Sequence, residues 1–265
     1  MTTKAIEAGD FGYDAVDGNY LEATSITQNY HNWILDSIHK HIGKNILEVG
    51  AGVGLVTEKL SQKYSQRNLY SLEPSKVMYP TLQKKVRQEK LKVKNLFKGT
   101  ITDNFAKLKK LELNSLIYIN VLEHIEDDQT EIKEAYNLLA KNGTLVTFSP
   151  AGMWLYSPRD KRTGHYRRYS LEEKVDKLKK VGFDIVEARY FDIFGSLLWW
   201  GKFKLLKSDK ISQGQSGFYD KRVVPVMRAI EPKWLPFGKN IIVIGKKKKL
   251  GNFQKNSGQN FPLQY

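Results

Sequence analysis

The residues best suited to chemistry lie around a glycine-rich turn in the first quarter of the chain. The segment NILEVGAGVG places Gly50, Gly52 and Gly54 directly after a short apolar run that contains Glu48. Glycines allow the backbone to pass close beneath a ligand, and the helix that follows presents free amide donors and positive potential. The dinucleotide fingerprint requires GxGxxG, whereas this chain reads GxGxG followed by Leu55. The turn therefore predicts a nucleotide-type site of a different spacing.

A second acid supports this site. Glu73 ends the next predicted strand, in the segment SLEPS. An acid at the tip of the second strand, about 20 residues after the turn, can accept hydrogen bonds from both hydroxyls of a ribose. Glu48 is expected to be buried beside backbone amides and a cationic ligand. The alternative for each residue is an ordinary carboxylate with no ligand.

Histidines supply the candidate bases. His165 lies in a loop after the fifth predicted strand, together with Asp160, and such loops form the mouth of the site in a doubly wound sheet. These two residues and His124, which follows the fourth strand, are the predicted catalytic residues. The alternatives are architectural: a salt-bridge network that folds the loop, and a structural role for His124. A surface or packing role is expected for the remaining histidines, His31, His39 and His41.

The same loop offers contacts for an anionic part of the substrate. Arg167 and Arg168, with Tyr166, can clamp a phosphate or a carboxylate through bidentate hydrogen bonds. Stacking of these arginines on their own tyrosines is the alternative. The three residues are predicted to bind the substrate.

Short apolar runs that alternate with amphipathic segments position these residues. Alternation of this kind is typical of an α/β fold, with a doubly wound, mostly parallel sheet and helices on both faces. The predicted strands of the first half span residues 45–49, 68–72, 93–97, 115–119 and 144–148, and the predicted helices span 55–64, 77–88 and 125–140.

An N-terminal helix and a less regular second half complete the predicted fold. Apolar residues every four positions over 26–42 form one helix face, and Gly43 is expected to end that helix. Strands over 183–190 and 240–245 bring the sheet to seven strands. They enclose a helical insertion with a helix over 219–230, since a structureless loop of that length would be improbable.

These elements divide the chain into four parts. Residues 1–24 are a loose lead-in, and residues 250–265 are a flexible tail. Residues 25–190 and 240–249 form the main domain. Residues 191–239 form a basic, aromatic helical cap inserted before the last strand.

Composition narrows the class of protein. The 265 residues include no cysteine, which excludes disulfide scaffolds, thiolate zinc sites and cysteine nucleophiles. No metal site is predicted. The N-terminus lacks the apolar core of a signal peptide, so the expected location is the cytoplasm.

Positive charge gathers near the C-terminus. The net charge is +15, and residues 201–265 hold 14 basic residues against three acidic ones. This asymmetry indicates an anionic partner such as nucleic acid, an acidic membrane surface or a phosphorylated substrate, and the alternative is solubility alone. The segment FGSLLWWGKFKLLK (194–207) places Trp199 and Trp200 beside lysines. It suits an anionic bilayer, a lid over an apolar substrate, or packing of the cap on its own core.

Taken together, the motifs resemble those of class I S-adenosylmethionine-dependent methyltransferases. The resemblance rests on LEVGAGVG (47–54), SLEPS (71–75), KGTITD (98–103) and INVLEHIEDD (119–128), and it continues in LYSPRDKRTGHYRRYS (155–170). The GHYRRY element is similar to that of a bacterial subgroup associated with small-molecule or surface-glycolipid pathways.

The resemblance implies a cofactor site for S-adenosylmethionine at the ends of neighbouring strands. The glycines would approach the methionine part above Glu48, and Glu73 would hold the ribose hydroxyls. Thr100 and Ile101 would line the adenine, although many members have an Asp in place of Thr100. Asn120 would offer a backbone carbonyl to the methionine amine. The implied cofactor-binding residues are Glu48, Gly50, Gly52, Gly54, Glu73, Thr100, Ile101 and Asn120.

The expected function is in-line methyl transfer to oxygen or nitrogen of a small-molecule or lipid-linked acceptor, with peripheral contact to an anionic membrane. An RNA methyltransferase that docks through the basic cap is the first alternative. Against it, the chain reads Asn120-Val121-Leu122-Glu123 where an NPPY-type tetrapeptide would mark amino methylation. A non-catalytic protein that binds S-adenosylmethionine or associates with a membrane is the second alternative.

Overall fold

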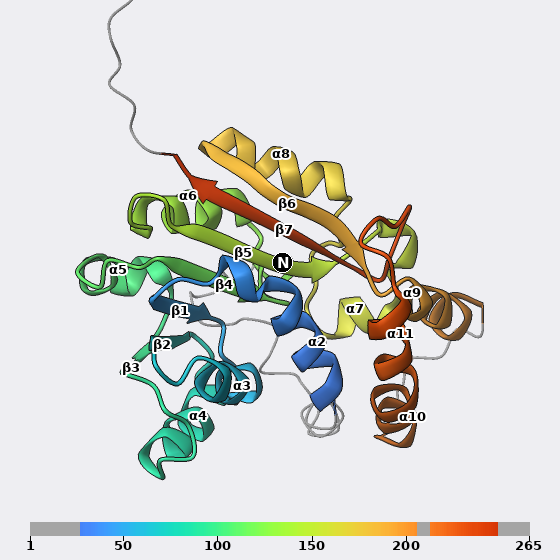
Figure 1. Cartoon of the computed structure of the whole chain (residues 1–265), viewed down its shortest axis with the longest axis horizontal. Coiled ribbons are helices and arrows are strands. Elements are labelled where there is room, and N and C mark those ends of the chain that lie inside the picture. Colours follow the sequence, from blue (N-terminus) through green and yellow to red (C-terminus); the bar gives the residue numbers. More distant parts are fainter. Residues whose placement is uncertain (1–26, 206–212, 249–265) are drawn as a thin grey trace, which may run out of the picture.

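A seven-stranded sheet runs through the centre of the structure, with the strand order β3-β2-β1-β4-β5-β7-β6 (Figure 1). The computed structural model describes residues 27–205 and 213–248. Strands β1 to β5 are parallel, and β7 runs antiparallel to both β5 and β6. The predicted α/β class with a mostly parallel sheet is therefore confirmed. The strands are β1 (Asn45–Val49), β2 (Asn68–Glu73), β3 (Asn95–Lys98), β4 (Ser115–Ile119), β5 (Thr144–Pro150), β6 (Phe183–Phe191) and β7 (Asn240–Lys247).

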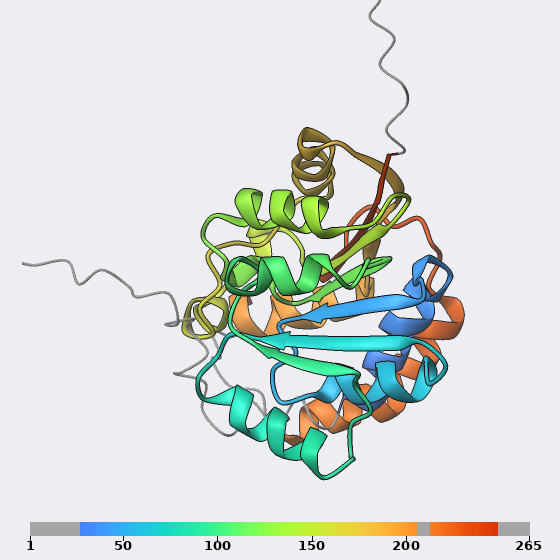
Figure 2. The ribbon, with the colours of Figure 1, turned by 90° about the vertical axis from the view of Figure 1, so that its left-hand side faces the viewer.

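Helices cover both faces of the sheet (Figure 2). One apolar core joins α5, α6 and α8 to one face, and a second core joins α2, α3 and α11 to the other. The helices are α2 (Gln28–Ile38), α3 (Leu55–Lys63), α4 (Met78–Arg87), α5 (Ile101–Lys109), α6 (Asp128–Leu138), α7 (Pro158–Arg162), α8 (Leu171–Val181), α9 (Ile193–Trp199), α10 (Gln213–Phe218) and α11 (Val224–Ile230). Among the described residues, no helix is both long and apolar enough to cross a lipid bilayer.

The central strands could be recognised in the sequence because they are buried on both faces. Every residue of β5 is buried, and a strand covered on both sides carries a nearly continuous apolar run. The predictions for β1 and β4 match their observed bounds. The strand predicted over 93–97 begins two residues later, at Asn95.

One prediction about helices was wrong, and one helix was missed. The N-terminal helix ends at Ile38 and is followed by a short 3-10 turn, so Gly43 does not cap it. Gly43 instead packs closely, since a Cβ at this position would lie 2.5 Å from Cβ of Asn114. Helix α5 was not predicted. It begins at a reciprocal capping box in which Thr100 and Asp103 bond each other's backbone amides, a device that stabilises helix N-termini.

Between β6 and β7 the chain forms α9, a π-helical turn (Trp200–Leu205), α10, a second π-helical turn (Tyr219–Val223) and α11. We call these elements the cap helices. The helix predicted over 219–230 is present, with the π-helical turn as its first part. Figure 1 shows the cap helices gathered beyond the starting end of β7. The predicted lead-in (1–24) and tail (250–265) lie outside the described residues, and the domain boundaries stay predictions.

Buried Asp220 of the cap helices fixes the N-terminus of α2. Its two carboxylate oxygens accept hydrogen bonds from the backbone amides of Asn29 (3.1 Å) and Tyr30 (2.8 Å). The first amides of a helix have no partner within the helix, so Asp220 caps α2 from a distant segment. The position of α2 over the sheet therefore depends on the cap helices.

We expect Asp220→Ala to lower the free energy of unfolding by about 1–2 kcal/mol, the usual cost of losing an N-cap side chain. Urea denaturation followed by circular dichroism measures this loss. Asp184→Ala is the matched control, because Asp184 is exposed and its ion pair among the described residues is with the exposed Lys248. An equal loss in the two variants would contradict the capping role of Asp220.

Candidate functional site

The glycine turn lies at the carboxyl edge of the sheet, between β1 and α3. Gly50, Gly52 and Gly54 all have positive φ angles, which glycine adopts without strain. A Cβ on Gly50 would lie 2.6 Å from a methyl group of Val121, and one on Gly54 would lie 2.6 Å from Leu91. Two of the glycines are thus required by packing within the protein, whereas Gly52 has space beside it.

Glu73 at the tip of β2 is bonded to the glycine turn. Its buried carboxylate accepts hydrogen bonds from the amides of Gly52 (2.5 Å) and Ser75 (2.7 Å). Charge-assisted bonds of this kind are among the stronger ones in proteins. The carboxylate is therefore held at the edge of the sheet, where the sequence placed it.

Glu48 lies beneath the turn, buried at the end of β1. Thr57 donates a hydrogen bond to its carboxylate (2.6 Å), and Ser71 donates a second (3.2 Å). Burial raises the pKa of Glu48 to about 8, against the opposing effect of these two hydroxyls. A carboxyl group with so high a pKa is poised to gain stability from a cation placed beside it.

A cavity of about 470 Å³ opens above these two acids. We call it the first cavity. All the residues predicted to bind the cofactor line it except Gly54, which packs against Leu82 and Leu91 instead. The structure thus brings together residues from the ends of β1, β2 and β4 and from the start of α5. The predicted residues that line the first cavity are Glu48, Gly50, Gly52, Glu73, Thr100, Ile101 and Asn120.

Asp103 also lines the first cavity and was missed in the sequence. Its carboxylate accepts hydrogen bonds from the amide and the hydroxyl of Thr100, both at 2.8 Å. The amide bond and then the hydroxyl bond lower the pKa of Asp103. The Thr-x-x-Asp spacing of a capping box was the signal that could have found this residue.

A second cavity of about 740 Å³ lies between the carboxyl edge of the sheet and the cap helices. It meets the first cavity at two residues, His31 and Asn120, which line both. Asn120 follows β4 directly and has a positive φ of 54°, an uncommon conformation that often occurs at functional sites. The arrangement provides two adjacent compartments.

A surface or packing role was expected for His31, and the structure places it at the junction of the two cavities. It lines both cavities, and burial lowers its pKa to about 4 despite the opposing charge of Asp220. His31 is therefore a neutral imidazole at neutral pH. No local signal in the sequence could have identified it, because its place depends on how Asp220 positions α2.

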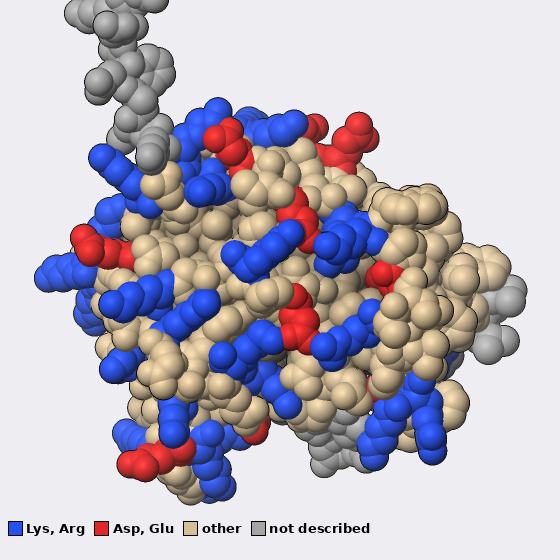
Figure 3. Space-filling view, in the orientation of Figure 1, with Lys and Arg blue, Asp and Glu red and all other residues tan. Residues whose placement is uncertain are grey.

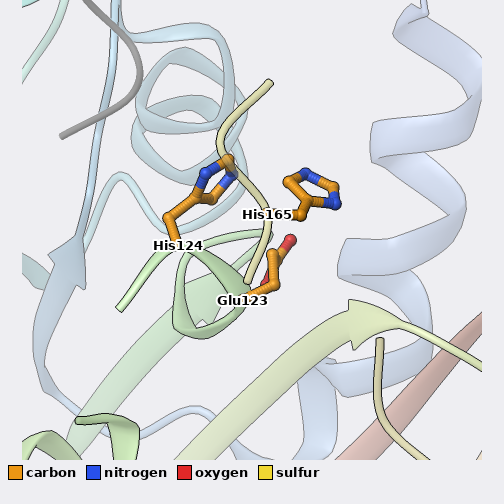
Figure 4. Close-up of side chains that lie close together, drawn as sticks. All are labelled: Glu123, His124 and His165. Carbon is orange, nitrogen blue, oxygen red and sulfur yellow. The ribbon is translucent and has the colours of Figure 1, made fainter. Parts of the chain in front are cut away.

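Glu123, His124 and His165 lie close together between the two cavities (Figure 4). The two imidazole rings meet edge to face, with centroids 4.5 Å apart, and the Glu123 carboxylate points toward His165. Ligand atoms of all three lie within 4.8 Å of one another. In the described part of the chain this is the one group of side chains that could hold a metal ion. The sequence predicted none.

The charge state of this group follows from its burial. Both carboxylate oxygens of Glu123 are buried and have no hydrogen-bond partner among the described residues. Burial raises the pKa of Glu123 and lowers that of His124 well below its usual range. Glu123 is therefore biased toward its protonated, neutral form, and His124 toward its unprotonated, neutral form. When no cation is bound, Glu123 can carry the proton.

His165 lines the second cavity and is held by Asp160. Its Nδ1 lies 2.9 Å from an Asp160 oxygen, and the same carboxylate accepts bonds from the buried guanidinium of Arg168. Burial raises the pKa of Asp160, but the bonds from His165 and Arg168 outweigh it and lower the pKa to about 2. An ionised Asp160 can only accept, so Nδ1 of His165 carries a proton and Nε2 is left as an acceptor.

The residues predicted to bind the substrate are divided between two places. Arg168 lines the second cavity and stacks on Trp199, with 4.7 Å between guanidinium carbon and ring centroid. Arg167 pairs with Asp128 at 2.9 Å and donates to a backbone carbonyl at 2.7 Å. Arg167 and Tyr166 do not belong to the described linings of the two cavities. No sequence motif marks the buried Asp128 as the partner of Arg167, so this ion pair could not be predicted.

Comparison with solved structures identifies the fold. The chain is similar to a SAM-dependent methyltransferase from Archaeoglobus fulgidus, with 16% identity, a TM-score of 0.55, and cover of 87% of this chain and all of that one. The fold is that of the S-adenosylmethionine-dependent methyltransferases. Phosphoethanolamine N-methyltransferase 2 of Haemonchus contortus, solved with phosphomonomethylethanolamine and S-adenosylhomocysteine, is similar over 94% of this chain and 62% of its own, with 14% identity and a TM-score of 0.55.

Sequence comparisons agree with this fold. Residues 47–145 match the family model described as a methyltransferase domain, and they include the glycine turn, Glu73 and the end of β4. An uncharacterized methyltransferase of Bacillus velezensis is 28% identical over 137 residues. That match spans 51% of this chain and 60% of the relative. The matched segment contains the described lining of the first cavity except His31.

The buried Glu48 predicts a pH-dependent stability in the cofactor-free protein. The unfolded chain releases this proton near pH 4.5, whereas the folded protein keeps it up to about pH 8. Between these values the folded state binds more protons, so stability falls as pH rises. We expect Glu48→Gln, which keeps an oxygen acceptor for Thr57, to become progressively more stable than the wild type, by up to about 3 kcal/mol at pH 7.

Urea denaturation at several pH values from 5 to 8 measures this difference. Glu172→Gln on α8 provides the matched control, because Glu172 is exposed and its removal should not change the pH dependence. A constant difference between Glu48→Gln and the wild type across this range would show that Glu48 is ionised in the folded protein.

Proposed function

We propose that the protein is an S-adenosylmethionine-dependent methyltransferase that methylates oxygen or nitrogen of a small-molecule or lipid-linked acceptor. The observation that supports this most is the pair of cavities that meet at His31 and Asn120. In-line transfer needs a donor and an acceptor in adjacent compartments whose relative position is fixed. We further propose a cytoplasmic location with peripheral contact to an anionic membrane.

The residues of the first cavity fit the cofactor. Glu73 is held where it can exchange its bonds with Gly52 and Ser75 for the hydroxyls of a ribose. Glu48 would supply negative charge beneath a cationic ligand, and the open side of Gly52 leaves space for close approach. Many relatives have an Asp at the position of Thr100, near the adenine. In this protein Asp103, which is bonded to Thr100, would supply that acid.

The chemistry assigned to the protein's own residues is positioning and proton transfer. S-adenosylmethionine, when bound, supplies a methyl group on a sulfonium, and positive charge leaves the sulfur as the methyl is displaced. The protein must align the acceptor and exclude water, and alignment alone can contribute about 7–11 kcal/mol to lowering the barrier. The walls of the second cavity, with Trp199 and Phe203 among them, provide that exclusion.

His165 is the residue we assign as general base for a hydroxyl or protonated amine acceptor. Asp160 fixes the tautomer in which Nε2 can accept a proton, as in other histidine–carboxylate pairs. The ring of His124 packs edge to face against that of His165, and the carboxylate of Glu123 points toward His165. Neutral His31 faces both cavities and is placed to orient the acceptor.

The distribution of charge favours this function over RNA methylation. On the face seen in Figure 3, basic side chains are scattered and the surface over α9 is largely uncharged. Lys246 pairs across the sheet with Thr144, at the edge opposite the cavities, whereas Asn240 at the start of β7 pairs with Pro150 beside them. The described basic residues of the last quarter are therefore divided between two ends of the sheet, whereas a continuous docking surface for RNA would require them to lie together.

Binding of the cofactor product tests the first part of this proposal. We expect isothermal titration calorimetry to detect binding of S-adenosylhomocysteine to the wild type, and Glu73→Gln to weaken it at least tenfold. Glutamine offers one acceptor oxygen where two hydroxyls need a carboxylate. The exposed Glu172→Gln should bind as the wild type does. A wild type that binds neither S-adenosylhomocysteine nor S-adenosylmethionine would overturn the proposal.

Transfer of a labelled methyl group tests the second part. We expect methyl-labelled S-adenosylmethionine, incubated with the protein and an extract of its native cells, to label the small-molecule or lipid fraction. His165→Asn, which can still donate to Asp160, should lower this rate by about 10²–10⁴ with unchanged binding of S-adenosylhomocysteine. Label that RNase removes would favour the RNA alternative. No label in any fraction would leave a protein that only binds the cofactor.

A further inference from the structure

The described lining of the second cavity has four basic side chains and one acid. The cations are Arg159, Arg168, Lys202 and Lys239, and Asp160 is the one acidic residue in the described lining. They come from α7, the His165 loop, the cap helices and the segment before β7. Cations from four segments that converge on one cavity repel one another unless anions compensate them.

Two of these cations pair with carboxylates of described residues. Arg168 is paired with Asp160 at 2.8 Å. Lys239 lies 3.6 Å from buried Asp192 and above the ring of Tyr30, with 4.8 Å to the centroid. Asp192 is itself shared with two tyrosine hydroxyls, so it offers Lys239 only part of its charge.

Lys202 has no carboxylate partner among the described residues. Its described hydrogen-bond partner is the neutral side chain of Gln215. Burial, and after it the positive charge of Arg159, lower the pKa of Lys202. Arg159 and Lys202 are thus close enough to repel, and both face the same space. An anion between them would relieve this repulsion.

Apolar side chains form much of the remaining lining, and several of them reach solvent. Trp199 and Phe203 form part of its wall. Phe194, Leu198 and Phe218 line the cavity and are also exposed, at 38%, 47% and 65%. A cavity that is lined by aromatic rings and whose apolar rim reaches solvent can hold a chain that continues beyond it.

We propose that the second cavity binds an amphiphilic acceptor, with its phosphate or carboxylate against Arg159, Lys202 and Lys239 and its apolar chain leaving between Phe194, Leu198 and Phe218. This inference rests on the proposed function, because it takes the second cavity as the acceptor site. Arginine and lysine form their strongest hydrogen bonds with such oxyanions in partly desolvated sites. Leu197 and Trp200 are also exposed and extend this apolar surface. We take a lipid layer as the source of the amphiphilic acceptor.

Calorimetry with dodecyl phosphate, below its micelle concentration and with the protein saturated with S-adenosylhomocysteine, tests this proposal. We expect dodecyl phosphate to bind at least tenfold more tightly than dodecanol or inorganic phosphate. Dodecanoate in place of dodecyl phosphate distinguishes a carboxylate ligand from a phosphate ligand. The double variant Arg159→Gln/Lys202→Gln should weaken binding of dodecyl phosphate at least tenfold.

The matched control is Lys161→Gln/Arg162→Gln, which removes the same charge from exposed positions of α7 and should bind as the wild type does. Circular dichroism checks that each variant is folded. If the double variant unfolds, the single variant Lys202→Gln replaces it and should also weaken binding of dodecyl phosphate. Phe218→Ser should weaken binding of dodecyl phosphate and leave that of inorganic phosphate unchanged.

Three results would overturn the proposal. Dodecanol that binds as tightly as dodecyl phosphate would remove the anionic subsite. Inorganic phosphate that binds as tightly as dodecyl phosphate would remove the apolar one, and equal weakening by both double variants would leave only a general effect of charge. Titrating dodecyl phosphate without S-adenosylhomocysteine separates this failure from failure of the proposed function, because the amphiphile can bind when the cofactor product does not.

Discussion

The contact on which the first cavity depends is the hydrogen bonding of the Glu73 carboxylate to the amides of Gly52 and Ser75. It ties the turn after β1 to the end of β2, two parallel neighbours whose carboxyl ends share one edge of the sheet. The same oxygens are those that a ribose would require. In the cofactor-free protein the amides of Gly52 and Ser75 occupy the carboxylate oxygens to which ribose hydroxyls would bind. The position of this wall of the cavity is therefore fixed before a ligand binds.

The second cavity depends in the same way on Asp192. This fully buried residue follows β6 with a positive φ of 65°, and its carboxylate accepts bonds from Tyr30 of α2 and from Tyr219 of the cap helices. Lys239 reaches it from the segment before β7. One strained residue thus joins three segments that are distant in sequence. Because α2 carries His31, Asp192 and Asp220 together determine what lies at the junction of the cavities.

Much of the sheet and of the cofactor site could be predicted from the sequence, because both are encoded locally. Strand β4 is a run of apolar residues buried on both faces, and the glycine turn must follow β1 directly. His31 could not be predicted, since its role depends on Asp220, 189 positions away. Arg167 was misassigned for a related reason. A pair of arginines in a loop points to an anion, but only the fold shows that Arg167 meets Asp128 whereas Arg168 faces the cavity.

Both cavities contain ionisable groups that lower the stability of the protein when no ligand is bound. Glu48 is a buried acid whose pKa is raised to about 8, and the described lining of the second cavity has four cations and one acid. Each arrangement lowers the stability of the empty protein, and each would be relieved by a ligand of opposite charge. Residues that violate the rules of a stable core usually do so at functional sites. The two arrangements favour ligands of opposite charge: Glu48 would lose its proton beside a cation in the first cavity, and the positive charge around the second cavity favours an anion. A cationic methyl donor and an anionic acceptor are the combination that satisfies both.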